Sequence, residues 1–320
     1  MQQPKVSVIV PVHNAAATVE ACVRSILEQE APGLECILIE NHSEDDSLPV
    51  CRRLAASDAR IRLAVCREVG VSAARNLGLE LATGDIIGFC DADDLLEPGA
   101  VGTVVSLLRS HPEALGVIGA FYTGENTPEG IRKQYRGRRC RSLSAKKAIM
   151  LTVDSRTVMG SVWNKYYRAE AAKRFRFDPS LSYCEDTHYN VSLLSAFPGA
   201  HLVYTGQPLY CYMLNSQSVT HQSDRLYDEN GELRYIAALK KILQDCPLDA
   251  ACRSVVRMKI ASLAIDYLYA GEADGRRKAG LTAEWKQNRR QLLKNAARFD
   301  VKDHAKQIVR GLLRGRRRGV

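Results

Sequence analysis

Short apolar runs alternate with segments of helical periodicity over the first 90 residues, and this alternation most constrains the fold. Runs of β-branched and aliphatic residues predict four buried strands, at 6–10, 36–39, 61–65 and 86–90. Apolar residues at helical spacing predict helices at 15–29, 47–57 and 71–82. This order indicates an α/β protein with a largely parallel sheet and helices on both of its faces.

The remainder of the chain has a less regular pattern. We expect a helix at 95–110, a strand at 115–123, a Gly- and Arg-rich mobile loop at 124–142 and a helix at 143–153. Strand-like runs follow at 202–204 and 209–212, and from about residue 224 the pattern is helical. We therefore expect one domain over residues 1–223 and a helical C-terminal region with a basic tail over residues 224–320.

The cysteines and the apolar runs bear on the cellular compartment. None of the ten cysteines forms a C-x-x-C pair, and several lie in apolar runs, as Cys90 does. This pattern favours reduced, buried thiols in a cytosolic protein over a disulfide framework or a zinc site. We see no signal-peptide pattern and no run of the ~18–20 apolar residues that a membrane span needs. We expect a soluble, cytoplasmic protein.

The formal net charge of +9 is concentrated at the C-terminus. Residues 301–320 carry seven Lys and Arg against one Asp, and their apolar residues fall near one helical face. This tail is either a helix that binds the surface of an anionic membrane or a solvated, disordered terminus. No helix-turn-helix, zinc finger or aromatic RNA-binding signature accompanies the basic charge, so we expect no nucleic-acid partner.

Three polar segments follow predicted strands: His13-Asn14, Glu40–Ser43 and Asp91–Asp94. In a parallel sheet they should converge on the edge where ligands bind. The three carboxylates of Asp91-Ala92-Asp93-Asp94 repel one another unless a cation is present, and their oxygens suit Mg²⁺ or Mn²⁺ shared with a substrate diphosphate. The alternative is that Asp93 or Asp94 is the N-cap of a helix that starts near Leu95.

The sequence strings "VSVIVPVHN", "CILIENHSEDDS", "GVSAARNLGLELATGDIIGFCDADD" and "YCEDTHYN" occur in this order at 6–14, 36–47, 70–94 and 183–190. Together they resemble the family 2 glycosyltransferases of the glycosyltransferase-A fold, over about residues 5–220. The resemblance implies a single Rossmann-like α/β domain with a mixed central sheet. It also implies a nucleotide-sugar half at about 1–123 and an acceptor half at about 124–223.

The resemblance assigns a nucleotide-sugar site to ten residues: Pro11, Val12, His13, Asn14, Glu40, Asn41, Arg75, Asp91, Ala92 and Asp93. The family usually has Asp-Asp-Gly-Ser where this chain has Glu40-Asn41-His42-Ser43, so the identity of the base stays open. The ring of His13 could stack on the base or merely end a strand. Residues 41–46 could equally form a helix-capping turn, and Arg75 could lie on a solvated helix face.

The resemblance also suggests metal ligands. Asp93 would bind a Mn²⁺ or Mg²⁺ ion on the diphosphate, and Asp91 would contact the ribose and lie beside the ion. His221 lies where the family closes a lid over the donor, and it could reach the metal or be structural. Lys165, in "WNK", could contact a phosphate or be solvated.

The Glu185-Asp186 pair resembles the acidic pair that the family uses for catalysis. In an inverting displacement a carboxylate takes the proton of the acceptor hydroxyl, and Asp186 is assigned that role with Glu185 beside it. An Asp with the ordinary pKa of ~4 is ionised at neutral pH. The alternative is a helix N-terminus with acidic first-turn residues.

The implied activity is the transfer of a hexosyl or N-acetylhexosaminyl group from a nucleotide-sugar, with UDP as the expected nucleotide. The acceptor would be a hydroxyl of a glycan or a lipid-linked glycan, in surface polysaccharide biosynthesis, with the enzyme on the inner face of the membrane. The alternatives are a nucleic-acid-binding protein and an inactive nucleotide-binding protein with a basic tail. A phosphohydrolase of the haloacid dehalogenase type is disfavoured, because that family carries its Asp-x-Asp on the first strand.

Overall fold

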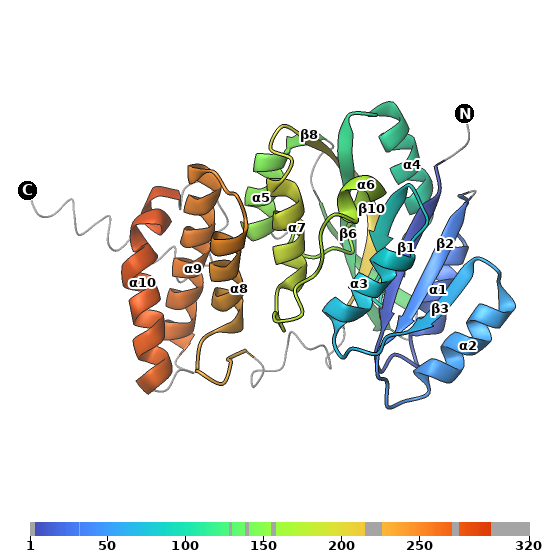
Figure 1. Cartoon of the computed structure of the whole chain (residues 1–320), viewed down its shortest axis with the longest axis horizontal. Coiled ribbons are helices and arrows are strands. Elements are labelled where there is room, and N and C mark those ends of the chain that lie inside the picture. The colour runs from blue at the N-terminus through green and yellow to red at the C-terminus, as the bar shows by residue number, and fades with distance from the viewer. Residues whose placement is uncertain are drawn as a thin grey trace, which may run out of the picture.

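The computed structural model describes residues 4–31, 33–127, 130–137, 141–154, 158–214, 226–270 and 275–295. A twisted mixed sheet lies at the centre of the N-terminal part, with helices on both faces, and the C-terminal helices stand side by side at one end (Figure 1). This arrangement confirms the expected α/β fold with a mixed central sheet and C-terminal helices.

The sheet begins as a parallel unit and becomes mixed. Strands β3 (Ile61–Val65), β2 (Leu34–Glu40), β1 (Val6–Val12) and β4 (Ile86–Phe89) are parallel neighbours in this order. The order continues with β9 (Lys165–Arg168), β6 (Ala114–Thr127), β10 (His201–Met213) and β5 (Leu95–Leu96). Strand β9 is antiparallel to both β4 and β6, while β6 and β10 are parallel. Two further strands pair outside this path, β7 (Gly130–Arg136) with β6 and β8 (Arg141–Ser144) with β10.

Both faces of the sheet are covered because its central strands are apolar on both sides. Along β1, Val8 and Val10 belong to one buried cluster and Ile9 to the other, as the alternation of side chains in a strand requires. Helices α1 (Val19–Leu27), α2 (Ser47–Ser57) and α4 (Ala100–Ser110) belong to the first cluster. Helices α3 (Val71–Leu81), α5 (Ala145–Asp154), α6 (Ala169–Ala172) and α7 (Glu185–Ser195) belong to the second.

The C-terminal helices extend the second cluster. They are α8 (Arg234–Asp245), α9 (Ala250–Ala270) and α10 (Gly275–Asn295). Val256 and Ala261 of α9 are fully buried in the same apolar cluster as Leu193 of α7. The core therefore runs on from the sheet domain into the C-terminal region, and the division at residue 223 stays a prediction. No helix among the described residues is long and apolar enough to cross a bilayer.

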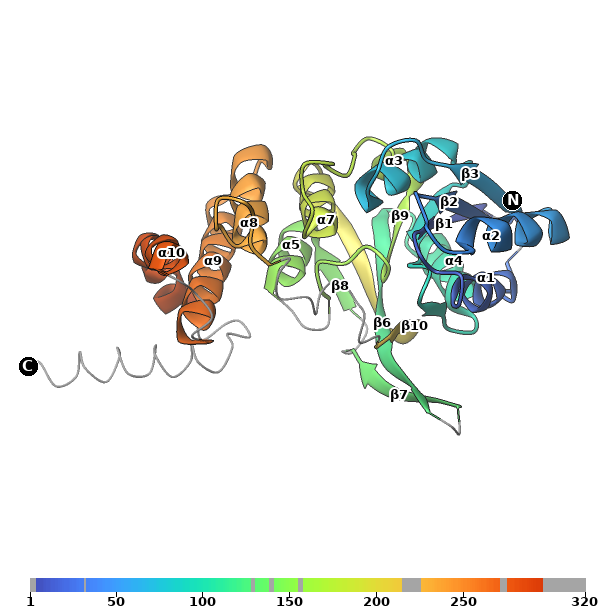
Figure 2. The same ribbon diagram turned by 90° about the horizontal axis from the view of Figure 1, so that it is seen from below.

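Two local predictions from the sequence were wrong. The helix expected at 95–110 starts at Ala100, because Leu95–Leu96 pairs with β10 as the short strand β5. The loop expected at 124–142 contains an antiparallel hairpin in which β7 pairs with the end of β6, and this hairpin projects from the sheet (Figure 2). Every residue of β7 is exposed, so the hairpin has no buried apolar face that a sequence pattern could reveal.

Candidate active site

The carboxyl ends of β1, β2 and β4 meet at one edge of the sheet because these strands are parallel neighbours. The loop after β1 contacts the loop after β2 at several points. The ring Nδ1 of His13 lies 2.8 Å from the backbone oxygen of Asn41. The backbone N–H of Asn14 donates to Ser43 Oγ at 3.1 Å, and Asn14 Oδ1 accepts from the N–H of Glu44 at 2.8 Å. The predicted convergence of these two loops is therefore present.

Two of the predicted nucleotide contacts already have protein partners. Glu40 is buried, and its Oε1 accepts the N–H of Ser43 at 2.6 Å. The Asn41 side chain donates to the carbonyl of Glu68 at 2.6 Å and accepts the N–H of Gly70 at 2.8 Å. Asn41 therefore ties the loop between β3 and α3 to the end of β2. The ring of His13 is exposed, so it remains accessible to a base.

Asp94 differs in its environment from the other two carboxylates of its motif, Asp91 and Asp93. It is buried, with Oδ2 accepting the hydroxyl of Tyr210 at 2.7 Å and Oδ1 accepting the N–H of Met213 at 2.7 Å. Asp94 therefore anchors β10 beneath the loop that follows β4. The capping alternative is wrong, because α4 starts at Ala100 with Gly99 as its N-cap.

Asp91, which also accepts a hydrogen bond from Arg75, and Asp93 are the carboxylates of this loop that stay partly exposed. The Asp91 side chain is 29% exposed, and Asp93 is half-buried, with the buried Ala92 between them. Burial, and then the charge of Asp91, raise the pKa of Asp93 above its usual range. A cation between these side chains would offset the repulsion and favour the ionised form of Asp93, so the donor set fits a hard divalent ion.

Arg75 joins this loop to the start of α7. Its Nη2 donates to Asp91 Oδ1 at 3.1 Å, and its Nη1 donates to Glu185 Oε1 at 2.6 Å. The guanidinium lies over the ring of Phe177 and is almost fully buried, so the solvated-face alternative for Arg75 is wrong. Burial disfavours its charge, but Asp91 and Glu185 outweigh burial and raise its pKa.

The acidic pair lies in the first turn of α7. The N-cap is Cys184, with φ 59°, so neither Glu185 nor Asp186 holds the capping position. Asp186 Oδ1 accepts the N–H of Thr187 at 2.7 Å. Burial, and then the charge of Glu185, raise the pKa of Asp186 to about 6, while Arg75 opposes the shift. The ordinary value of ~4 expected from the sequence is therefore too low for this site.

Lys165 is a buried charge whose surroundings the sequence did not reveal. Its side chain is fully buried, and Nζ donates to backbone oxygens of Val158 (3.0 Å), Met159 (3.0 Å) and Ser161 (2.6 Å) and to Asn164 Oδ1 (2.9 Å). It is neither solvated nor open to a phosphate, so both expectations for Lys165 were wrong. Burial lowers its pKa to about 7, and the charge of Asp186 opposes this shift.

The segment held by Lys165 packs on the acidic helix. Asn190 of α7 donates to the backbone oxygens of Gly160 (2.6 Å) and Ser161 (3.2 Å). A Cβ at Gly160 would lie 1.9 Å from Thr187 Oγ1, so only glycine allows this contact. Residues 158–161 and the first turn of α7 thus form one packed unit.

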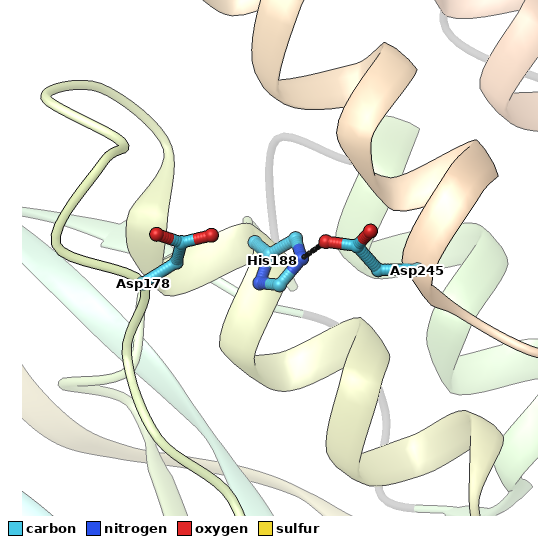
Figure 3. Close-up of side chains that lie close together, drawn as sticks. All are labelled: Asp178, His188 and Asp245. Carbon is cyan, nitrogen blue, oxygen red and sulfur yellow. Dashed lines mark hydrogen bonds and ion pairs between the residues drawn. The ribbon is translucent and has the colours of Figure 1, made fainter.

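A second cluster of possible metal ligands lies at the contact between α7 and α8 (Figure 3). His188 Nε2 lies 3.0 Å from Asp245 Oδ2, with Asp178 nearby in the loop before α7. The ammonium of Lys241 lies 3.1 Å from Asp178 Oδ2 and 3.0 Å from Asp245 Oδ2. A metal ion would have to displace this ammonium, so we interpret the cluster as an ion-pair network that joins α8 to α7.

His221 lies outside the described residues, as do Cys140 and the tail at 301–320. The nine cysteines within the described residues are free. Every other predicted site residue lies at the carboxyl edge of β1, β2 and β4 or on α3 and α7 beside it. The ligand roles assigned to them stay predictions.

The fold and this site define an α/β protein with acidic side chains at the carboxyl edge of its parallel strands. The family model described as "Glycosyl transferase family 2" matches residues 7–176, and this chain therefore belongs to that family. It is 29% identical over 222 residues to the uncharacterized glycosyltransferase EpsJ of Bacillus subtilis, a match that covers 68% of this chain and 63% of EpsJ. The chain thus spans slightly less than two thirds of that relative.

Solved structures resemble the fold at low sequence identity. The crystal structure of Staphylococcus aureus TarS 1–349 in complex with UDP-GlcNAc has a TM-score of 0.68 and 15% identity, covering 88% of this chain and 78% of that one. The mannosyltransferase PcManGT of Pyrobaculum calidifontis, in complex with GDP-Man and Mn²⁺, has a TM-score of 0.57 and 17% identity, covering 98% and 81%. At this identity the likeness establishes the fold alone.

Proposed function

We propose that this glycosyltransferase moves a hexosyl or N-acetylhexosaminyl group from a UDP-sugar to a hydroxyl of a glycan or a lipid-linked glycan, with inversion. One observation carries this proposal. Arg75 binds both Asp91, in the loop proposed to hold the diphosphate, and Glu185, beside the proposed base. One guanidinium would thereby connect the two halves of an inverting site, through Nη2 to the diphosphate loop and through Nη1 to the residue beside the base.

The donor would bind along the loops after β1 and β2. Pro11, Val12, His13 and Asn14 would face the base and ribose, with the exposed ring of His13 stacking on the base. Glu40 and Asn41 would contact the base through lone pairs or N–H groups that their hydrogen bonds to the protein do not use. The UDP-GlcNAc complex of TarS supports a UDP-sugar for a protein of this fold.

Asp91 and Asp93 would hold a Mn²⁺ or Mg²⁺ ion, which would neutralise the developing charge of the departing diphosphate. The raised pKa of Asp93, which burial and then the charge of Asp91 cause, supports this assignment, as does the Mn²⁺ in PcManGT. Ala92 keeps the two side chains one residue apart, and Arg75 holds Asp91 in place.

Asp186 would act as the base. As the acceptor oxygen bonds to the anomeric carbon, the bond from that carbon to the diphosphate oxygen breaks, and the hydroxyl proton passes to Asp186. With a pKa of about 6, Asp186 is mostly ionised at pH 7 and above. Glu185 is paired with Arg75, so it would orient the site while Asp186 takes the proton.

The acceptor half would comprise about residues 124–223, with the product entering a surface polysaccharide made at the inner face of the membrane. Binding of nucleic acid is the weaker alternative, because the excess of basic residues lies in the C-terminal region and not around the acidic edge. An inactive nucleotide-binding protein is also the weaker reading, since both acidic pairs of the site are retained.

Calorimetry with UDP and Mn²⁺ tests the donor site. We expect Asp93→Asn to weaken metal-dependent UDP binding by about 100-fold or more, because it removes a charged metal ligand. Asp58→Asn is the control, since it removes a partly exposed carboxylate, paired with Arg60, that precedes β3 at the opposite edge of the sheet. Equal UDP affinity in the wild type and the Asp93 variant would contradict the metal assignment. A thermal-shift series with UDP-, GDP-, CDP- and dTDP-sugars would identify the nucleotide.

A further inference from the structure

The outer face of α10 carries a concentration of positive charge that the proposed reaction does not use. Residues 275–300 hold eight Lys and Arg against two Asp and Glu, and residues 301–320 hold seven against one. These 46 residues therefore have a net charge of +12, while the chain as a whole has +9, so the first 274 residues have a net charge of −3. The charge is therefore distributed unevenly along the sequence, with a basic C-terminal part.

In α10 the acidic side chain faces the protein, and the exposed side chains on the other face include several basic ones. Leu281 and Asn288 are buried, and Trp285 packs against the core shared with α9. The only acidic side chain of this helix, Glu284, is turned inward, where it pairs with Lys240 at 2.5 Å. The remaining surface of α10 is therefore free of negative charge.

Five basic side chains form the outer face of α10, and we call them the basic face: Arg276, Lys278, Lys286, Arg289 and Arg290. All five are exposed, and none forms an ion pair with any other residue that the structure describes. At a rise of 1.5 Å per residue they cover about 21 Å of the helix. Helix α10 lies at the end of the molecule opposite α2 (Figure 1).

We propose that the basic face of α10 is a docking surface for an anionic lipid bilayer. These exposed cations are spread along the helix and over about half of its circumference. Such a surface can face an extended sheet of negative headgroups, and Lys and Arg near that sheet bind it additively. The apolar side of α10 is already buried against α9, so binding is electrostatic and reversible, without insertion of this helix into the lipid.

The composition of the basic face favours a membrane over nucleic acid. Trp285, the only aromatic residue of α10, packs against the core shared with α9, whereas proteins that bind single strands combine a basic groove with exposed aromatic stacking platforms. The positions between the cations on this face hold small or polar residues such as Ala279, Thr282 and Ala283. Docking would place the enzyme beside a lipid-linked acceptor, and only this last step rests on the proposed function.

Cosedimentation of the full chain with vesicles tests the proposal. Vesicles of phosphatidylcholine with about one third phosphatidylglycerol should bind the wild type, and vesicles of phosphatidylcholine alone should not. Replacing the five residues of the basic face by Gln should lower the partition coefficient more than tenfold. Rising salt should weaken the binding of the wild type, because exposed charges are screened.

Two further variants make the outcome specific. In the control, Arg24, Arg52, Arg53, Arg60 and Arg109 are replaced by Gln, which removes the same charge from other exposed sites and should leave binding within about twofold. A variant in which all seven Lys and Arg of 301–320 become Gln should retain binding that depends on the basic face.

Three results would overturn the proposal. They are unchanged binding in the basic-face variant with an unaltered melting temperature, an equal loss in the control variant, and complete loss of binding when only the tail is neutralised. Binding to a DNA or RNA oligonucleotide more tightly than to vesicles, lost with the same five substitutions, would assign the basic face to nucleic acid and also overturn it.

Discussion

At the scale of single residues, the site depends on buried charges whose neighbours set their protonation. Burial and the adjacent Glu185 raise the pKa of Asp186, while Arg75 and Lys165 act in the opposite direction. Lys165 is itself fully buried, so its own pKa is lowered to about 7. These two groups influence each other, and a change at either one should alter the pH dependence of the other.

Asp186→Asn should lower the transfer rate by about 10³-fold with little change in donor affinity, because it removes a general base and no proposed donor contact. In the wild type, the rate should rise as pH increases through about 6, since the base acts only when it is ionised. Steady-state kinetics from pH 5 to 9 would measure both effects. A variant that turns over at the wild-type rate would require a different base.

Lys165→Met should lower the free energy of unfolding by about 2–3 kcal/mol at pH 7, because it leaves buried carbonyl groups without donors. Since the pKa of Lys165 is lower in the folded than in the unfolded state, the unfolded state binds more protons between about pH 7 and 10.5. The Lys165 contribution to stability therefore rises with pH in this window.

Urea denaturation of the wild type and Lys165→Met at pH 7 and pH 9 would measure this contribution, because other titrating groups cancel in the difference. The gap between the two proteins should widen at pH 9. A gap that narrows or stays constant would show that Lys165 keeps its ordinary pKa in the fold.

At the scale of elements, α3, β4 and α7 meet at Arg75. The hydrogen bonds of its side chain reach Asp91, which follows β4, and Glu185, which begins α7. Asn76, the next residue of α3, donates to the carbonyl of Phe177 at 2.8 Å and accepts its N–H at 2.8 Å. Helix α3 therefore sets the position of the acidic turn of α7 relative to the loop after β4.

Arg75→Met should lower kcat by about 10²-fold or more and destabilise the protein by about 3–5 kcal/mol, because it leaves two carboxylates of a mostly buried network unpaired. Glu185→Gln is the matched comparison, since it keeps the Arg75–Asp91 pair and should retain donor affinity. Kinetics and calorimetry on both variants would check this. If a stably folded Arg75→Met protein had the wild-type kcat, the proposed role of Arg75 in positioning Asp91 and Glu185 would be contradicted.

At the scale of the whole molecule, the C-terminal helices belong to the core that supports α7. Met258 and Leu263 of α9 are buried in the cluster that contains residues of α5 and α7. Asp178, His188 and Asp245 (Figure 3), together with Lys241, add polar contacts between α8 and the segment around α7. Helix α7, which carries the proposed base, is thus packed between the sheet domain and the C-terminal region.

A chain truncated after residue 223 should fail to unfold cooperatively, because it exposes the apolar face that α5 and α7 turn toward α8 and α9. A chain truncated after residue 300 is the matched control, since it retains every described helix. Thermal melts followed by near-ultraviolet circular dichroism would distinguish them. A cooperative melt of the shorter chain near the temperature of the full chain would show that residues 1–223 fold alone.

Much of the fold and of the candidate site is predictable from local pattern. The periodicity of apolar residues predicts β1 to β4 and helices α1 to α3, because strands and helices bury their faces at fixed spacings along the chain. The acidic motifs at Asp91–Asp94 and Glu185-Asp186, in order with the other family strings, indicate the family and its candidate carboxylates. The pattern did not reveal β5 or β7, since two paired residues and a fully exposed strand leave no apolar signature.

The sequence by itself therefore determined the α/β alternation, the family and the carboxylates to consider. Only the tertiary structure decided which of them are free for chemistry. It buried Asp94 against Tyr210, which lies 116 residues away, and joined Arg75 to Glu185 across 110 residues. It also enclosed Lys165 among carbonyl groups. The physical reason is that burial and charge pairing depend on neighbours brought together by topology, whereas periodicity reports only on adjacent residues.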